Sequence, residues 1–153
     1  MSAPISSPPY QLRPAERADA EFLWQLRQAA MRESVEKNWG TWDAIQQRQF
    51  FDRGFVPHQT AVILVEGRPV GRLDVSRSRF EFFLGIIELL PEMQGRGLGS
   101  AVIRRLLDEA HAQQVPVRLQ LLKSNTAALR LYERLDFKRS GETTTHQLML
   151  WQP

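Results

Sequence analysis

Apolar residues in the first part of the chain recur with the spacing of amphipathic helices. Between residues 15 and 37 they fall about three or four positions apart, which predicts a helix with one buried face. Gly40 is expected to end this helix, and Thr41 is expected to cap a second helix that ends near Gly54. Two consecutive helices are therefore predicted before residue 55.

Shorter apolar and β-branched runs before and after these helices predict strands. They cover residues 10–13, 60–65 and 69–75, and Glu66-Gly67 provides a turn between the last two. Residues 80–90 form a longer and almost wholly apolar run. We expect it to be a central strand covered on both faces.

Two residues punctuate that long strand. Gly85 lies inside it and indicates a bulge or a close approach by another backbone, and Pro91 ends it. A glycine-rich loop then leads into a helix that ends near residue 113. The apolar stripe of this helix comprises Leu98, Val102, Leu106 and Ala110.

The remaining predicted elements alternate between strand and helix. They are a strand at 117–122, a helix capped by Ser124 or Asn125, and strands at 137–142 and 146–151. The complete order is β-α-α-β-β-β-α-β-α-β-β. This order predicts an α/β fold in which helices cover the faces of a mixed sheet.

Length and composition fit one soluble domain. The 153 residues are expected to form a single domain, 1–153, with a flexible polar and proline-rich tail at 1–9. The sequence has no signal-peptide pattern, no transmembrane run and no cysteine, so we expect a cytoplasmic protein without disulfides or thiolate metal sites. The net charge of +3 is spread along the chain, which argues against a nucleic-acid partner.

The glycine-rich loop at residues 94–100 has the features of an anion site. A helix N-terminus offers unpaired N–H groups and partial positive charge, and glycines let the backbone approach a phosphate closely. Arg96 adds a possible charged contact. The glycine spacing, G-x-G-x-G, differs from those of the Walker A loop and the dinucleotide fingerprint. A flexible turn before a helix is the alternative interpretation.

Two segments resemble motifs of the GNAT (Gcn5-related N-acetyltransferase) family. In the loop, Gln94, Gly97 and Gly99 match the fixed positions of the family's Arg/Gln-x-x-Gly-x-Gly/Ala motif. Residues 123–137 are similar to its later Asn-x-x-Ala-x-x-Leu-Tyr-Glu-x-x-Gly-Phe motif, although Asp136 stands where the family usually has glycine. Aspartate can adopt the positive φ of such a turn at some energetic cost, so we expect either local strain or a shifted turn at this position.

This resemblance implies the GNAT fold and its cofactor. The fold is α/β (α+β), a central mixed, mostly antiparallel sheet of about six or seven strands flanked by about four helices. The cofactor is acetyl-CoA, with no metal. The resemblance assigns its binding to a set of main-chain and side-chain groups: Ile87, Leu89, Gln94, Gly95, Arg96, Gly97, Leu98, Gly99, Ser100 and Asn125. For Asn125, helix capping is an equal alternative.

The implied reaction is direct transfer of the acetyl group from a thioester to an amine. The N–H of Leu89 is expected to stabilise the carbonyl oxygen, and Tyr132 lies at the family's general-acid position. The matching position for a glutamate base is Gln120, which cannot accept a proton. Glu88, a carboxylate in an apolar strand, is the better candidate base. The alternatives are a core role for Tyr132 and an ion pair with a buried arginine for Glu88.

Acidic and aromatic residues near the junction of the first two helices are candidates for binding a cationic acceptor amine. They are Glu33, Glu36, Trp39, Trp42 and Asp43. His146, which enters the last strand, is a further candidate. A solvated helix face and packed tryptophans are the alternative. No group of residues has metal-ligand spacing, so no metal is expected.

Three functions are compatible with these observations. The first is an acetyl-CoA-dependent N-acetyltransferase that acts on a primary amine of a small molecule or peptide. The second is a non-catalytic GNAT-fold module that binds acyl-CoA or a protein partner. The third is a nucleotide-binding regulator, which the glycine spacing argues against. A homodimer is possible, and no membrane partner is expected.

Overall fold

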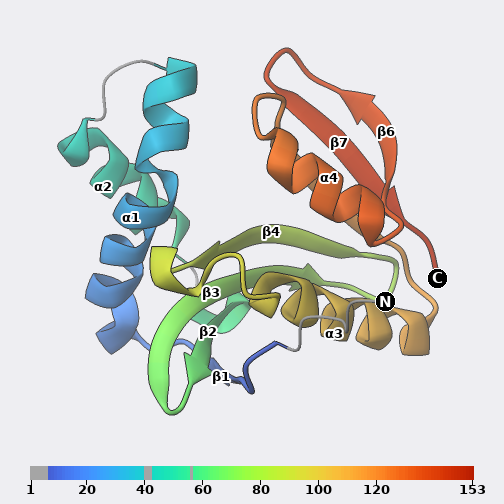
Figure 1. The fold of residues 1–153 in the computed structure, drawn as a ribbon, viewed down its shortest axis with the longest axis horizontal. Coiled ribbons are helices and arrows are strands. Elements are labelled where there is room, and N and C mark those ends of the chain that lie inside the picture. Colours follow the sequence, from blue (N-terminus) through green and yellow to red (C-terminus); the bar gives the residue numbers. More distant parts are fainter. Residues whose placement is uncertain (1–6, 40–42, 56) are drawn as a thin grey trace. The chain divides into compact units, whose positions relative to one another are not determined.

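The computed structural model describes residues 7–39, 43–55 and 57–153 and divides into two units. The first unit comprises Met1–Asp74 and Ile86–Leu98, and the second comprises Val75–Gly85 and Gly99–Pro153. Figure 1 shows the elements in chain order. The predictions for Gly40, Thr41 and Trp42 concern residues that lie outside the described ones.

The first unit contains an antiparallel ribbon and two helices. Strand β1 (Gln11–Pro14) pairs with β2 (Thr60–Val65), and β2 pairs with β3 (Arg68–Arg77). The predicted turn at Glu66-Gly67 is confirmed, because both residues have positive φ, 52° and 77°. That combination is typical of the tight hairpin turn whose twist matches the strands.

Helices α1 (Ala20–Trp39) and α2 (Ala44–Gly54) lie side by side in this unit (Figure 1). The α2 helix begins at Asp43, whose side chain accepts a hydrogen bond from the Gln46 N–H at 3.0 Å. This bond satisfies one of the free donors at a helix N-terminus. Trp24 of α1 packs against Phe51 of α2, with ring centroids 5.7 Å apart. The predicted helix pair is therefore present and shares a buried core.

The strand β4 (Phe82–Leu89) begins in the second unit and ends in the first. The prediction that both of its faces are covered is wrong. Its exposure alternates at the start: Phe82 is 1% exposed, whereas Phe83 is 37% exposed. Phe80, which was expected in the strand, precedes it and is 69% exposed. A uniformly apolar run cannot reveal this alternation, because the pattern of polar residues that marks a solvent face is missing.

The end of β4 lies against β3 within the first unit. The Leu90 N–H donates to the Val70 carbonyl at 2.8 Å. A Cβ atom built on Gly71 would lie 2.6 Å from the Glu88 carbonyl oxygen and 2.7 Å from Leu89 Cδ2. Real Cβ atoms do not approach so closely, so only glycine lets the two backbones meet here. Sequence reasoning assigned a close approach to Gly85 and did not anticipate the one at Gly71.

The second unit contains the helix α3 (Leu98–Gln113, from Gly99 on), strand β5 (Val117–Leu122) and helix α4 (Thr126–Arg134), followed by β6 (Lys138–Glu142) and β7 (His146–Trp151). Strand β5 pairs in parallel with β4 through Phe82, Phe83 and Leu84. It pairs antiparallel with β7, which in turn pairs antiparallel with β6. The predicted strands at 117–122 and 146–151 are confirmed residue for residue.

The strands form a seven-stranded sheet in the order β1-β2-β3-β4-β5-β7-β6. The predicted mixed, mostly antiparallel sheet is confirmed, and so are four helices in the described part of the chain. The apolar stripe predicted for α3 is buried, since Leu98, Val102, Leu106 and Ala110 are at most 2% exposed. Among the described residues, none of the helices combines the length and the apolar character needed to cross a membrane.

Asp136, the departure from the family motif, has φ of +70°. Of the two expectations for this position, local strain and a shifted turn, the positive φ supports local strain. We predict that Asp136→Val lowers the free energy of unfolding by about 1–2 kcal/mol, because a β-branched residue is strained in this region. Asp136→Gly should unfold at the same temperature or higher. Thermal unfolding of both variants tests this, and equal stability of the valine variant would contradict the strained turn.

Candidate acetyl-CoA and catalytic site

The loop before α3 has the backbone geometry of an anion cradle. The last turn before it, η3 (Pro91–Met93), ends at Gln94, whose side-chain Nε2 donates to the Leu89 carbonyl at 3.1 Å. Gly95 and Gly97 then have φ of +73° and +81°. These values are rare for residues with a side chain. The glycines thus turn the chain so that α3 begins directly after them.

The start of α3 supplies main-chain donors. The N–H groups in the first turn of a helix have no carbonyl partner one turn earlier, and they carry partial positive charge. The side chain of Leu98 is fully buried, so only its main-chain N–H could face a ligand. Arg96 is exposed. A Cβ atom built on Gly95 would meet no atom within 4 Å, which leaves open space beside the loop. These features fit a diphosphate.

Asn125 is the N-cap of α4. Its side-chain oxygen accepts a hydrogen bond from the Ala128 N–H at 3.2 Å, and its main-chain carbonyl accepts from the Leu129 N–H at 3.1 Å. The structure therefore shows the capping role that sequence reasoning left open. Its contact with a cofactor stays a prediction.

Tyr132 lies on α4 and is 8% exposed. Its ring meets the ring of Phe137 edge to face, with centroids 5.5 Å apart. Burial raises the pKa of Tyr132 to about 12, so the phenol keeps its proton at neutral pH. The hydroxyl group forms no hydrogen bond with another residue in the described part of the chain. A packed ring with a free hydroxyl is compatible with a proton donor.

Glu88 is the buried carboxylate of β4, and its side chain is 1% exposed. Its Oε1 lies 3.9 Å from Arg27 Nη1, which is an ion pair but too long for a hydrogen bond. Both carboxylate oxygens are buried and have no hydrogen-bond partner among the described residues. Burial raises the pKa of Glu88, while the charges of Arg27 and Arg72 oppose the rise.

The predicted catalytic residues belong to different units. Glu88, Ile87 and Leu89 lie in the first unit with residues 94–98 of the loop. Tyr132 lies in the second unit, which also holds Gly99, Ser100, Asn125 and His146. Gln120, which the sequence comparison matched to a candidate base position, is exposed on β5.

The acceptor candidates are only partly described. Glu33, Glu36 and Trp39 lie on α1, but their side chains are not among the described ones, and Trp42 lies outside the described residues. Asp43 caps α2. His146 begins β7 as predicted, and its Nδ1 lies 2.7 Å from Thr145 Oγ1. Within the described ranges, no group of three or more His, Asp or Glu is arranged to hold a metal ion.

The model of the acetyltransferase (GNAT) family matches residues 20–137. The chain belongs to the GNAT family. The match begins at the first residue of α1 and ends at Phe137, the last residue of the second motif. It covers both the glycine loop and the α4 segment, so the two motifs that carry the resemblance lie within one family domain.

Among known proteins, this GNAT chain is similar to the N-alpha-acetyltransferase RimI of Mycobacterium tuberculosis (strain ATCC 25618 / H37Rv). The two are 38% identical over 79 residues, and the alignment covers 49% of this chain and 49% of the relative. The chain thus spans about half the length of the curated relative that it matches.

Two solved structures have the same fold. One is the PaiA N-acetyltransferase from Thermoplasma acidophilum in complex with coenzyme A, with a TM-score of 0.78, 10% identity, and coverage of 95% of this chain and 99% of that one. The other is the ribosomal-protein-S18-alanine N-acetyltransferase from Escherichia coli, with a TM-score of 0.66, 21% identity, and coverage of 93% and 91%. At these identities the likeness concerns the fold.

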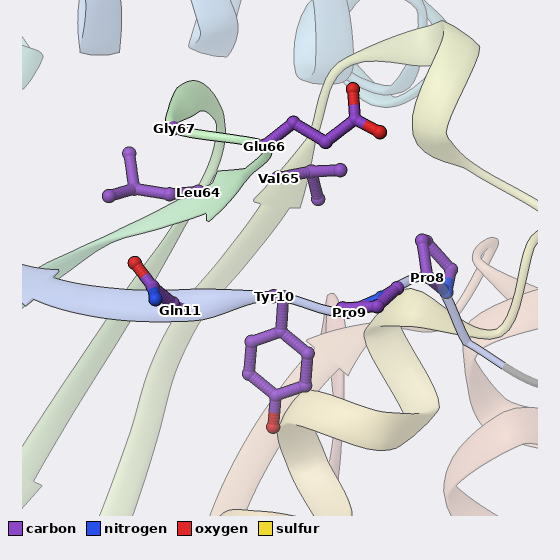
Figure 2. A pocket seen from close by; sticks show the side chains of 8 residues that line it. All are labelled: Pro8, Pro9, Tyr10, Gln11, Leu64, Val65, Glu66 and Gly67. Atoms are coloured by element: carbon purple, nitrogen blue, oxygen red, sulfur yellow. The ribbon is translucent and has the colours of Figure 1, made fainter.

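Figure 2 shows a pocket in the first unit of this GNAT chain that contains none of the predicted site residues. Its volume is about 350 Å³. It is lined by the segment before and within β1, by the end of β2 and by the β2–β3 turn: Pro8, Pro9, Tyr10, Gln11, Leu64, Val65, Glu66 and Gly67. Its single charged side chain, Glu66, is exposed, and nothing in this pocket points to thioester chemistry.

Sequence reasoning missed the charged residues around Glu88. It anticipated a buried arginine without naming one, and the structure identifies Arg27 of α1 together with Arg72 and Asp74 of β3. A signal was present in the sequence. Arg72 and Asp74 stand two positions apart among the apolar residues and glycine of 69–75, and such a spacing places both on one face of the strand.

Proposed function

We propose that this chain is an acetyl-CoA-dependent N-acetyltransferase that transfers the acetyl group directly to a primary amine of a small molecule or peptide. The observation that carries the proposal is the pair of positive-φ glycines, Gly95 and Gly97, directly before α3 in a chain of the GNAT family. A peptide or protein amine is supported by the names of two similar proteins, an N-alpha-acetyltransferase and a ribosomal-protein-S18-alanine N-acetyltransferase.

The loop would hold the diphosphate of acetyl-CoA. Main-chain N–H groups of residues 95–99 are the donors, and Arg96 adds a charge-assisted contact at the surface. Gln94 fixes the loop to the end of β4 through its bond to the Leu89 carbonyl. We propose that Ile87 and Leu89 offer main-chain groups to the pantetheine arm, and that the Leu89 N–H stabilises the developing charge on the acetyl oxygen.

Tyr132 would protonate the departing thiolate. When bound, acetyl-CoA supplies the thioester carbonyl and this leaving group. A phenol with a pKa of about 12 is neutral at the time of transfer and has a proton to give. It is a weaker acid than a free thiol, whose pKa is about 8.5, but burial also raises the pKa of a thiol. The free hydroxyl group and the desolvated ring support this role.

Glu88 would accept the proton of the attacking amine, directly or through water. A base must be ionised, and burial raises the pKa of Glu88 above that of an ordinary glutamate. Activity should therefore be present at high pH and be lost as the pH falls through this raised pKa. The amine itself also loses its proton with rising pH, so the substrate's own titration must be subtracted.

Glu88→Gln is predicted to lower kcat/KM by about 10²-fold and to flatten the acidic limb of the pH–rate profile. The glutamine keeps the shape of the side chain but cannot titrate. Glu92→Gln, which removes an exposed carboxylate close in sequence, is the matched control and should leave the profile unchanged. An unaltered acidic limb in Glu88→Gln would assign the base role to water or to another group.

The direct test of the proposed function is thiol release from acetyl-CoA in the presence of a panel of amines. The panel comprises polyamines, aminoglycosides, amino acids, peptides with free N-termini and lysine peptides. Turnover with at least one of them is expected. Binding of acetyl-CoA without turnover on any would favour the non-catalytic module instead.

Three further assignments complete the proposal. The two units would form one domain over 1–153, with residues 1–9 as a tail, which is supported by a family match that runs from the first unit into the second. Glu33, Glu36, Trp39, Trp42 and His146 would contact the acceptor. The protein would act in the cytoplasm without a metal ion, as a monomer or a homodimer, which sedimentation can distinguish.

A further inference from the structure

Three charged side chains of the first unit act on the buried carboxyl group of Glu88. Glu88 of β4 faces Arg27 from α1, and both Arg72 and Asp74 from β3 act on it electrostatically. Arg72 is 2% exposed, and Arg27 is 24% exposed. Two arginines and two carboxylates give no net charge, but the four partners are not equally engaged.

Arg72 is held by Asp74 and by two aromatic rings. Its Nε and Nη2 donate to the two oxygens of Asp74 at 2.8 and 2.7 Å, a bidentate geometry. Its guanidinium carbon lies 5.5 Å from the centroid of Phe51 and 5.9 Å from that of Phe55, and these two rings are stacked. The two rings and the Asp74 carboxylate therefore hold the Arg72 guanidinium in place, and Asp74 compensates most of the charge of Arg72.

Arg27 is engaged differently. Its ion pair with Glu88 is the one ion pair that it makes within the described residues. Its Nε is buried without a hydrogen-bond partner, as are Arg72 Nη1 and both oxygens of Glu88. Buried donors and acceptors without hydrogen-bond partners are costly unless they serve a function. Within the described residues, the charge of Arg27 thus acts on Glu88 without an ion pair to another carboxylate.

We propose that Arg27 and Asp74 are positioning residues that act on Glu88 in opposite directions: Arg27 favours the ionised carboxylate, and Asp74 opposes it by compensating Arg72 and by its own negative charge. The proposal rests on the proposed function in one respect, namely that Glu88 is the base. Its physical content, however, concerns a single carboxyl group and can be measured without any turnover.

The opposite effects of Arg27 and Asp74 on Glu88 matter because a general base must meet two requirements. It must be ionised at the working pH, and it must still hold a proton well enough to take one from an amine. Burial alone raises the pKa of Glu88, and the arginines lower it again. Without Arg27 the carboxyl group would remain protonated to higher pH. Without Asp74, Arg72 would lower the pKa further and leave a weaker base.

The experiment is a ¹³C NMR titration of the glutamate carboxyl groups in the full-length protein without ligands. The Glu88 signal is assigned by its absence in Glu88→Gln. Arg27→Gln should move the midpoint of that signal to higher pH, and Asp74→Asn should move it to lower pH. Arg68→Gln removes an exposed arginine from the same strand as Arg72 and should leave the midpoint unchanged. Shifts in the same direction, or none in either variant, would overturn the proposal.

Arg27→Lys keeps the titration informative if Arg27→Gln does not fold, since breaking a buried pair is often destabilising. Lysine retains the charge, so its midpoint should stay near that of the wild type. A midpoint as high as expected for the glutamine variant would contradict a charge effect.

The same variants can be used to measure the pH–rate profile of acetyl transfer. In that profile, Arg27→Gln should lower kcat/KM on the acidic limb by about tenfold and leave the plateau unchanged.

The two readouts separate this proposal from the function on which it rests. NMR midpoints that move in opposite directions support the electrostatic roles of Arg27 and Asp74 whatever the enzyme does. If the acidic limb then fails to follow the NMR midpoints, the positioning proposal stands, and Glu88 is removed from the reaction. If the NMR midpoints do not move, the positioning proposal fails even when the protein acetylates an amine.

Discussion

Gly97→Glu is expected to abolish coenzyme A binding, with Kd raised by at least about 100-fold, or about 2.7 kcal/mol. The φ of +81° at Gly97 is strained for any side chain, so the loop would have to rearrange before α3. A carboxylate at this position would also place negative charge where a diphosphate is expected to bind. Isothermal titration with coenzyme A measures the effect directly.

The matched control for this variant is Gly54→Glu. Gly54 is the last residue of α2, and a Cβ atom built on it would meet nothing within 4 Å. The Gly54→Glu substitution adds the same side chain and charge without strain, so the affinity for coenzyme A should be unchanged. Wild-type affinity in Gly97→Glu, in a protein that remains folded by circular dichroism, would refute the assignment of the loop.

Tyr132→Phe is expected to lower kcat by roughly 10²-fold while leaving the affinity for coenzyme A and the thermal stability close to those of the wild type. Phenylalanine keeps the ring that packs edge to face on Phe137 and removes only the hydroxyl group. Because that hydroxyl group forms no hydrogen bond within the described part of the chain, its loss should leave no buried partner unsatisfied. Steady-state kinetics with the best amine of the panel provide the measurement.

The chain has two tyrosines, so Tyr10→Phe makes the same chemical change at the other one. Tyr10 lines the pocket of Figure 2, outside the proposed site, and its loss should not affect kcat. A pH profile adds a second check. With a pKa of about 12, Tyr132 should not produce an alkaline limb near pH 10, where an ordinary tyrosine titrates. An unchanged kcat in Tyr132→Phe would remove the residue from the mechanism.

Local pattern was sufficient for most elements of the fold. The strands at 117–122 and 146–151 were predicted with their observed bounds, because Pro116 and Lys123 flank the first and Thr145 and Gln152 flank the second. The buried stripe of α3 followed from its helical spacing. The first helix was less well bounded: a short 3-10 turn, Arg17–Asp19, precedes α1, which begins at Ala20. Helix ends depend on caps that spacing does not reveal.

The candidate site was predictable to the extent that single residues carry it. Gly95 and Gly97 were recognised because glycine lets a backbone approach a phosphate closely, and the structure shows that both have positive φ. For Asp136, positive φ was one of two expectations, and the structure shows it. The charged partners of Glu88 were not named. Arg27 is 61 positions away in the sequence from Glu88, and a pairing over such a distance depends on the packing of α1 against the sheet rather than on any local pattern.

By itself, the sequence determined the family, the order of the elements and the loop that would hold a diphosphate, since each depends on neighbouring residues and on backbone preferences that act over a few positions. Only the tertiary structure decided the insertion of β7 between β5 and β6, the close approach at Gly71 and the surroundings of Glu88. The physical reason is that these features arise when segments remote in sequence pack together. Burial and the charges brought near by that packing set the pKa of a carboxyl group, and neither can be read from the residues beside it.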